Sequence, residues 1–374
     1  MPDHHVYLVP GFFGFANLGD LPYFAHVSEY LEEAFAERGV PVALHHVHTH
    51  PTASLRYRAS RLLDTIVTTA VGDGPIHLVG HSSGGLDARL LVTSGVSLTS
   101  DHDVEALMAR VQSVVTVATP HHGTPVASFF TGLLGQRLLQ LLSLFTTYVI
   151  VFGRVPVGLL SRMGRLFLRV DQLIGRDRSV ADQLVEQLLG DFTPERRDAL
   201  RAFLDEVGKD QALMAQLMPD AMDTFNAATA DREGVRYASV VARAPKPSLK
   251  SRLQMGVDPY MQVTRGVYGA LHRLSTRMPA IRIGELSAPH REALARRYLD
   301  VPDWHASDGI VPTLSQPWGT VLDAVTADHH DVIGHFHGPK HVPPHFDWLA
   351  SGSGFGREEF ERMWSKIVDH LLAA

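Results

Sequence analysis

Short apolar runs alternate with helical patterns over the first third of the chain. The runs that predict strands lie at 6–9, 40–46, 76–79 and 111–118. Helices are predicted where apolar residues recur at three- and four-residue intervals, at 21–38, at 55–71 and, after a glycine-rich turn at 80–85, up to about residue 92. Strands that alternate with helices are typical of a mostly parallel sheet with helices on both faces, so we expect an α/β fold of this kind.

The pattern changes after Pro120, where this alternation stops. Residues 129–175 are apolar, interrupted by glycines and contain five arginines, whereas residues 180–225 are helical and more acidic. No low-complexity linker separates these stretches from the rest of the chain. We therefore expect one α/β domain that contains a helical insertion. Its three parts are a first core part at 1–125, a helical lid or cap at 126–232 and a second core part at 233–374.

Strand signals return in the second core part. Apolar runs at 235–241 and 322–327 predict two more strands, and a helical pattern at 289–299 lies between them. The last 15 or so residues carry apolar side chains at helical spacing from Phe360 onward, which predicts a helix covering the sheet. The stretch at 242–279 is rich in proline, arginine and methionine and predicts no definite element.

Composition narrows the class of protein. The chain has 374 residues, 45% of them hydrophobic and 20% charged, which is an ordinary globular mixture. The formal net charge of −6 argues against a nucleic-acid-binding role, which requires a basic surface. The absence of cysteine excludes disulfides, thiolate metal sites and cysteine nucleophiles.

Two features bear on membranes and location. The longest apolar run, at 138–152, is too short and too polar for a membrane-spanning helix, so we expect no transmembrane span. The first residues show no basic segment followed by an apolar one, so we expect no signal peptide in this chain. A cytoplasmic location is the default expectation, and a secreted one follows if the chain is a processed form.

The strongest chemical signal is a G-x-S-x-G motif formed by Gly80, His81, Ser82, Ser83 and Gly84. It follows a predicted strand directly and precedes a predicted helix, which is the context that a nucleophile elbow requires. Glycines flank the serine because the strand and the helix approach each other closely at such a turn. Ser82 is therefore the predicted nucleophile, since the neighbouring Ser83 has a histidine and not a glycine two positions before it.

A serine hydroxyl needs a base that takes its proton and a third group that orients the base. In the α/β-hydrolase order an acidic residue and then a histidine follow the serine. Asp308, before a glycine, is the candidate acid, and His329, after the last predicted strand, is the candidate base. The alternatives are His330 for the base, and Asp303, Asp323 and Asp328 for the acid.

These segments resemble the true lipases of the Pseudomonas and Burkholderia type within the α/β-hydrolase fold. The matching segments are the oxyanion loop at 8–15, the elbow at 80–85, the strand and Thr-Pro-His-x-Gly turn at 114–124, the segment at 225–227, and the acid and base loops at 308–309 and 329–331. The resemblance implies the α/β-hydrolase fold with a mostly parallel sheet, helices on both faces and a helical lid or cap insertion.

The resemblance also implies roles for individual residues. Ser82 would be the nucleophile, Asp308 the orienting acid and His329 the base, and the backbone N–H groups of Phe12 and Ser83 would form the oxyanion hole. The chain departs from the family at one position of the oxyanion loop, where Pro10 replaces the usual histidine. Proline has no N–H to donate, so any hydrogen bond that the histidine makes in relatives must be replaced or absent here.

A structural calcium is a further implication of the resemblance. In several relatives the aspartate two residues after the base helps to hold this ion, and Asp331 occupies that position here. Its expected upstream partner is Asp300 or Asp303. The alternative is that Asp331 is a loop carboxylate that accepts hydrogen bonds from its own backbone. No other cofactor is expected.

The predicted function is a serine carboxylic-ester hydrolase, a lipase or esterase that cleaves acyl esters through a Ser-His-Asp triad and an acyl-enzyme. The apolar insertion would bind acyl chains, and its arginines could lie at a lipid–water interface; alternatively, the insertion is a cap packed permanently on the core or a dimer contact. A phospholipase or transacylase on the same scaffold, and an inactive hydrolase that serves as a binding module, are the alternative functions.

Overall fold

The computed structural model describes most of the chain. The described residues are 4–12, 23–96, 98, 103–152, 156–168, 175–248, 259–277, 286–342, 344–345 and 347–373. The second half of the predicted oxyanion loop, at 13–15, lies outside these residues, as do two of the five arginines of the insertion, Arg154 and Arg169.

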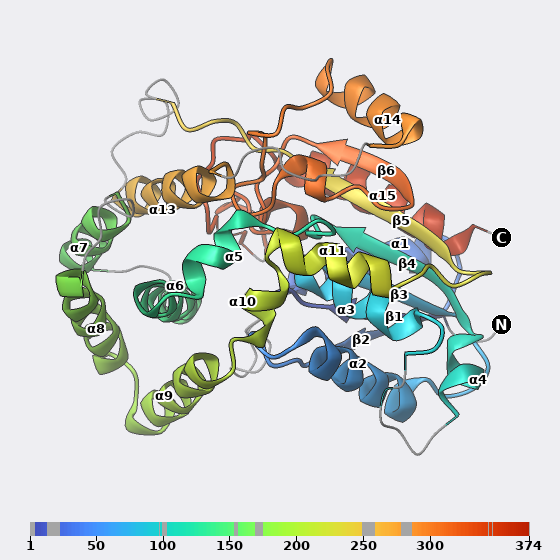
Figure 1. Ribbon diagram of the computed structural model, residues 1–374, viewed down its shortest axis with the longest axis horizontal. Helices are drawn as coiled ribbons and strands as arrows, with labels where there is room; N and C mark the ends of the chain where they lie inside the picture. The colour runs from blue at the N-terminus through green and yellow to red at the C-terminus, as the bar shows by residue number, and fades with distance from the viewer. Residues whose placement is uncertain are drawn as a thin grey trace.

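A six-stranded parallel sheet forms the centre of the molecule (Figure 1). Its strands are β1 (His4–Val9), β2 (Val42–His46), β3 (Ile76–His81), β4 (Val111–Val117), β5 (Arg236–Ala242) and β6 (Thr320–Val325). They lie in the order β2-β1-β3-β4-β5-β6, and every neighbouring pair is parallel. The predicted mostly parallel sheet is confirmed, and all six strands overlap the runs that predicted them.

Helices cover both faces of the sheet, as predicted. On one face, Val6 and Leu8 of β1 share a core with α1 (Ala25–Glu37) and α15 (Arg357–Leu372). On the other face, Tyr7 and Val9 pack with α2 (Leu55–Thr69) and α3 (Ser83–Val92). Successive side chains of a strand point to opposite faces, so one apolar run supplies both cores. The short α4 (Val104–Met108) precedes β4, and α14 (Ala288–Tyr298) packs beside β6.

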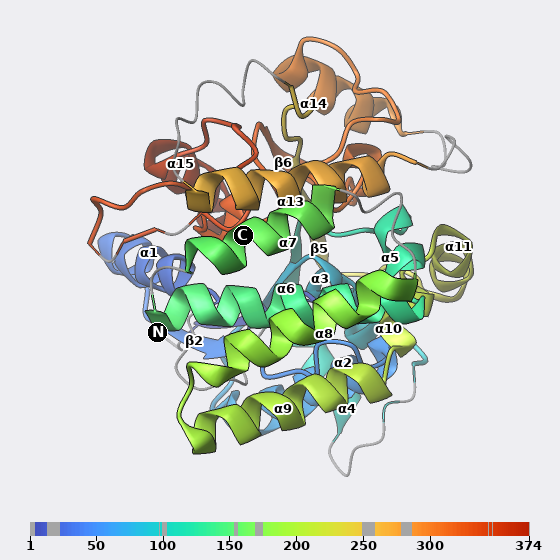
Figure 2. The same cartoon turned by 90° about the vertical axis from the view of Figure 1, so that its left-hand side faces the viewer.

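The chain between β4 and β5 is helical. It contains α5 (Pro125–Phe130), α6 (Leu133–Phe152), α7 (Val157–Leu168), α8 (Gly175–Gly190), α9 (Pro194–Lys209), α10 (Ala212–Gln216) and α11 (Pro219–Ala228). Helices α6 to α9 stand to one side of the sheet in Figure 1 and lie side by side, with similar directions, in Figure 2. Buried leucines of α6, such as Leu138 and Leu141, belong to the same apolar core as the α1 face of the sheet.

Helix α13 (Pro259–Ser275) comes from the stretch at 242–279, for which the sequence predicted no definite element. It packs along α7 and lies above helices α6 to α9 in the view of Figure 2. Its buried side chains, such as Val267 and Leu271, extend the same core. Among the described residues, no helix combines the length and the apolar character that crossing a membrane requires.

Candidate active site

Ser82 lies at the tip of a tight turn between β3 and α3. Its φ of 55° is in the left-handed region, which is strained for a residue other than glycine. The Ser82 N–H donates to the Val117 carbonyl oxygen at 2.9 Å, so the neighbouring strand β4 holds the turn. A Cβ added at Gly84 would lie 2.2 Å from the Val9 carbonyl oxygen, so a side chain there would push α3 away from β1. The motif residues thus allow the strained turn that presents the serine.

The loop after β1 passes directly over Ser82. A Cβ added at Gly11 would lie 2.4 Å from the Cβ of Ser82 and 3.0 Å from its Oγ. The next residue, Phe12, is a predicted oxyanion donor and lies buried beside this contact. The other predicted donor, Ser83, is the first residue of α3, where the N–H groups have no acceptor within the helix. This close approach therefore leaves the loop and the start of α3 next to the serine.

A buried ion pair is hydrogen-bonded to the loop after β1. Arg58 and Asp87 are both fully buried, and the Nη2 of Arg58 lies 2.7 Å from Asp87 Oδ2. The same Nη2 donates to the Pro10 carbonyl oxygen at 2.7 Å, so the charged pair also fixes the loop backbone. Burial raises the pKa of Asp87 to about 6, although Arg58 acts in the opposite direction. The sequence analysis did not identify this ion pair. Its sequence signal is Arg58, a charged residue that lies on the same apolar face of the helix as Leu55 and Leu62.

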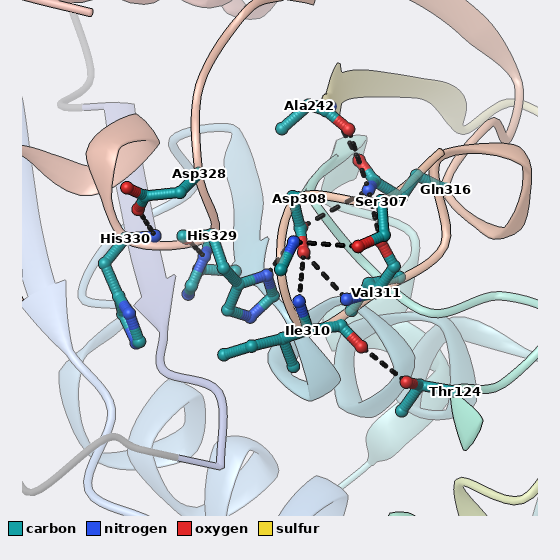
Figure 3. Close-up of polar contacts among 12 residues, drawn as sticks. Thr124, Ala242, Ser307, Asp308, Ile310, Val311, Gln316, Asp328, His329 and His330 are labelled. Atoms are coloured by element: carbon teal, nitrogen blue, oxygen red, sulfur yellow. Dashed lines mark hydrogen bonds and ion pairs between the residues drawn. The ribbon is translucent and has the colours of Figure 1, made fainter. Parts of the chain in front are cut away.

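Asp308 and His329 are hydrogen-bonded side chain to side chain (Figure 3). The Nδ1 of His329 lies 2.7 Å from Asp308 Oδ2, and both residues are fully buried. The other carboxylate oxygen of Asp308 accepts from the backbone N–H groups of Ile310 at 2.9 Å and Val311 at 2.7 Å. A carboxylate only accepts, so Nδ1 of His329 carries a proton, and in the neutral form of the ring the lone pair is on Nε2. That Nε2 is buried and has no hydrogen-bond partner among the described residues, which include Ser82.

His81 brings the base loop to the elbow. It precedes Ser82 in the chain, and its ring centroid lies 4.7 Å from that of His329. The Nε2 of His81 also bonds to the backbone oxygen of His329 at 2.8 Å. Residues separated by 248 positions are therefore in direct contact at the elbow.

The alternative base, His330, lies in a different environment. Its ring packs against the Trp348 ring, with centroids 5.0 Å apart. Figure 3 shows the His330 ring on the far side of the loop from Asp308. Burial lowers the pKa of His330 well below its usual value, so the ring is neutral. The carboxylate therefore meets His329 and not its neighbour.

The alternative acids have other partners. Asp303 and Asp323 each form an ion pair with a lysine. Asp328 accepts hydrogen bonds from backbone N–H groups of its own loop. Of the four candidate acids, all of which the structure describes, Asp308 is the one that is hydrogen-bonded to the His329 ring.

Asp331 belongs to a group of carboxylates beside the base loop. One carboxylate oxygen from each of Asp328, Asp331 and Asp347 lies within 4.8 Å of the other two. Burial raises the pKa of Asp328 to about 7, and burial together with the charge of Asp328 raises the pKa of Asp331 well above its usual value. The Oδ2 of Asp328 is buried without a hydrogen-bond partner. These oxygens fit a calcium ion, which takes oxygen ligands and would neutralise their mutual repulsion.

The partners of Asp331 differ from the expected ones. Asp300 and Asp303 do not belong to this group; each accepts a hydrogen bond from a backbone N–H in its own loop. Asp347 was not a sequence candidate, because it stands 16 residues downstream in an irregular segment. Only the folding of that segment against the base loop brings it near Asp331.

We expect calcium to stabilise the protein through these three carboxylates. Free calcium at 100 times its dissociation constant should add about 2.7 kcal/mol to the free energy of unfolding. The effect should be larger at pH 8 than at pH 6, because the carboxyl groups must lose their protons to bind the ion. The melting temperature of chelated protein with and without added calcium measures both effects.

Asp347→Asn should abolish most of the calcium response, and Asp300→Asn is its matched control. A melting temperature of the unaltered protein that ignores calcium at pH 8 would contradict this assignment. Magnesium, added at the same concentration, should give a smaller effect, because it demands a tighter octahedral geometry.

Comparison with known proteins agrees with this architecture. No family model matches the chain. The triacylglycerol lipase of Pseudomonas fragi is 28% identical over 145 residues, which cover 37% of this chain and 43% of the lipase. The zebrafish (Danio rerio) protein SERAC1 is 30% identical over 76 residues, covering 20% of this chain and 11% of that protein. The matches thus span less than half of either relative.

Solved structures match over the whole chain. Lipase 1 from Pelosinus fermentans superimposes with a TM-score of 0.55 at 16% identity, and the match covers 100% of both chains. A metagenomic carboxyl esterase superimposes with a TM-score of 0.51 at 16% identity, over 99% of this chain and 76% of the esterase. The chain therefore has the α/β-hydrolase fold of lipases and esterases, as the sequence motifs indicated.

Proposed function

We propose that this protein is a serine carboxylic-ester hydrolase of the lipase or esterase type. The observation that carries the proposal is the state of His329. Its Nδ1 is hydrogen-bonded to the buried Asp308, and its Nε2 is buried without a partner beside the elbow that holds Ser82. An imidazole held in this way is prepared to accept a proton on Nε2.

The first half of the reaction forms an acyl-enzyme. The Ser82 Oγ attacks the ester carbonyl carbon while His329 Nε2 takes the hydroxyl proton. The imidazolium that forms is stabilised by the Asp308 carboxylate, which two backbone N–H groups keep in place. The tetrahedral intermediate then collapses, the C–O bond of the ester breaks, and the imidazolium gives its proton to the leaving alcohol.

The second half releases the acid. Water attacks the acyl-enzyme, His329 takes a water proton, and the proton returns to Ser82 as the carboxylic acid leaves. In both halves the backbone N–H groups of Phe12 and Ser83 would stabilise the oxyanion. Loss of one such donor typically costs about 3 kcal/mol of transition-state stabilisation.

The substrate class follows from the inserted helices. Their apolar side chains are continuous with the core that contains Phe12. An acyl chain is the substrate part that such surroundings would bind, so lipids or other acyl esters are the proposed substrates. Two of the arginines that could meet a lipid–water interface already have protein partners, because Arg137 pairs with Asp182 and Arg162 bonds to Gln183 and Gln187. These helices can act as a cap that stays closed or as a lid that opens at an interface, and the two forms predict different kinetics.

A fluorophosphonate probe and a series of p-nitrophenyl esters test this proposal. The probe should label native protein at Ser82 and should fail to label heat-denatured protein. Hydrolysis should be measured from short to long acyl chains, across the solubility limit of one long-chain ester. A jump in rate above that limit favours a mobile lid and a lipase, and smooth saturation favours an esterase with a fixed cap.

Two outcomes would change the functional assignment. Absence of both labelling and hydrolysis would leave a binding module on a hydrolase scaffold. Faster product formation on addition of a simple alcohol, with the acyl ester of that alcohol as the product, would favour a transacylase; hydrolysis restricted to phospholipids would favour a phospholipase.

A further inference from the structure

The peptide group between Pro10 and Gly11 is held at both ends. Its carbonyl oxygen accepts from Arg58 at 2.7 Å, and its N–H, which belongs to Gly11, donates to the hydroxyl of Tyr23 at 3.3 Å. Pro10 itself has no N–H, so the Gly11 N–H is the first donor available in this loop. The plane of this peptide sets the direction of the chain into Phe12, the predicted oxyanion donor.

The Tyr23 hydroxyl continues to the base loop through His81. It lies 2.5 Å from His81 Nδ1, and His81 Nε2 lies 2.8 Å from the carbonyl oxygen of His329. Each of these residues is buried, so water does not compete for the bonds. The backbone of Tyr23 is fixed as well, because its carbonyl oxygen accepts from His335 Nε2 at 3.1 Å.

The donor and the acceptor of each hydrogen bond in this chain follow from the chemistry of the groups. A carbonyl oxygen only accepts, so His81 carries its proton on Nε2. Burial lowers the pKa of His81 well below its usual value, so the ring is neutral and its Nδ1 accepts. Tyr23 must then donate its O–H to Nδ1, and its oxygen is left to accept the Gly11 N–H. The four groups thus fit together in one arrangement.

We propose that Tyr23 and His81 are positioning residues that tie the oxyanion loop to the backbone of the base. This inference rests on the proposed function, because it assigns catalytic roles to Phe12 and His329. Through the tie, the backbone next to the oxyanion donor and the backbone of the base are held relative to each other at the elbow. Neither Tyr23 nor His81 needs to touch the substrate.

Tyr23→Phe tests the tie, because it removes one oxygen and keeps the ring. We expect kcat for ester hydrolysis, counted per serine that the probe labels, to fall about 10- to 100-fold, since small misplacements of catalytic groups have effects of this size. KM should stay within a factor of about two, because ground-state contacts are unchanged.

Tyr7→Phe is the matched control. Tyr7 lies on β1 and is buried, as Tyr23 is. Its hydroxyl is bonded at 2.9 Å to Thr69, the last residue of α2, and not to the oxyanion loop. It should lower the melting temperature to a similar degree and leave kcat unchanged. Equal kcat values in the two variants would overturn the proposal, because the hydroxyl of Tyr23 would then be merely structural.

His81→Gln supplies the second arm. A glutamine amide can still donate to the His329 carbonyl oxygen, but it has no acceptor at the position of Nδ1. It should lower kcat as Tyr23→Phe does, and the double variant should be no worse than the poorer single one, because both changes break the same tie. Multiplicative losses in the double variant would overturn the proposal.

Nuclear magnetic resonance gives a readout that needs no activity. The ¹⁵N shifts of His81 should report a neutral ring with the proton on Nε2. Tyr23→Phe should move the amide signals of Gly11 and of His330, which follows the bonded carbonyl, and Tyr7→Phe should move neither. Unmoved signals would overturn the tie even in an active enzyme. A protein that shows the tie but hydrolyses no ester would refute the proposed function alone.

Discussion

Ser82→Ala is expected to lower kcat for ester hydrolysis by about 10⁶-fold, the size of effect that follows loss of a serine nucleophile. The variant loses the attacking oxygen, while the strained turn, the oxyanion donors and the base stay in place. Because alanine differs from serine only by the loss of Oγ, the fold should not change. Initial rates on a p-nitrophenyl ester, together with the melting temperature, measure both effects.

Ser83→Ala is the matched control for this experiment. The Ser83 hydroxyl is buried and has no hydrogen-bond partner in the described part of the chain, and the predicted oxyanion donor is its backbone N–H, which alanine keeps. Activity should therefore stay within a few-fold of the unaltered protein. If Ser82→Ala kept a few per cent of the activity, or if Ser83→Ala caused the larger loss, the nucleophile would have been assigned to the wrong residue.

Asp308→Asn extends the test to the acid. The amide oxygen of the asparagine should stay where Oδ1 accepts the Ile310 and Val311 N–H groups, so its NH2 group replaces Oδ2 and donates to His329 Nδ1. The ring then keeps its place but carries its proton on Nε2, which is the wrong tautomer for a base. The expected loss in kcat is about 10⁴-fold. Asp303→Asn, at a candidate acid that instead pairs with a lysine, should leave kcat unchanged.

Acidification is expected to unfold this protein near pH 5. Burial lowers the pKa of histidines in the core: to about 3 for His77 and His335, to about 4 for His272, and well below the usual value for His81, His121 and His330. Such groups stay neutral in the folded state, whereas in the unfolded chain they take up protons below about pH 6.5. The unfolded state thus binds more protons, and stability falls as the pH falls through 6.5.

The expected loss is large. Each histidine whose pKa is lowered to about 3 or 4 should cost about 2 kcal/mol of the free energy of unfolding between pH 7 and pH 5. The carboxyl groups with raised pKa values act in the opposite direction: Asp87, Asp328, Asp331 and Asp347. Calcium bound as expected would remove the last three from this balance, which leaves a net loss of several kcal/mol. This is of the order of the whole stability of a typical domain.

Denaturant unfolding of calcium-saturated protein between pH 5 and 8 measures how steeply the free energy of unfolding changes with pH. His77→Asn should reduce the slope by about 1.4 kcal/mol per pH unit, the value of one proton. Ser113→Ala is its control, because it removes the partner of His77 Nδ1 without removing a titratable group. A free energy of unfolding that stays constant from pH 7 to pH 5 would contradict the prediction.

The sequence predicted the parts of this protein that depend on near neighbours. Strands and helices follow the local spacing of apolar residues, so all six strands were found, with ends within a few residues of the observed ones. The elbow is local as well, because its strained serine and its small neighbours lie within five consecutive positions. Asp308 and His329 were found through their order in the chain and the family resemblance, and the tertiary structure brings them within hydrogen-bond distance.

Contacts between distant segments could not be read from the chain. Arg58 on Pro10, Tyr23 on His81, and Asp347 beside Asp331 all join residues whose local sequence carries no sign of the partner. Helix α13 was missed for the same reason, since its apolar side chains are buried by contact with α7, a distant segment of the chain. Secondary structure is decided by short-range periodicity, whereas which buried polar group meets which is decided by the packing of whole elements. The sequence by itself therefore determined the scaffold and its candidate nucleophile, and tertiary packing decided how the polar groups around that serine are connected.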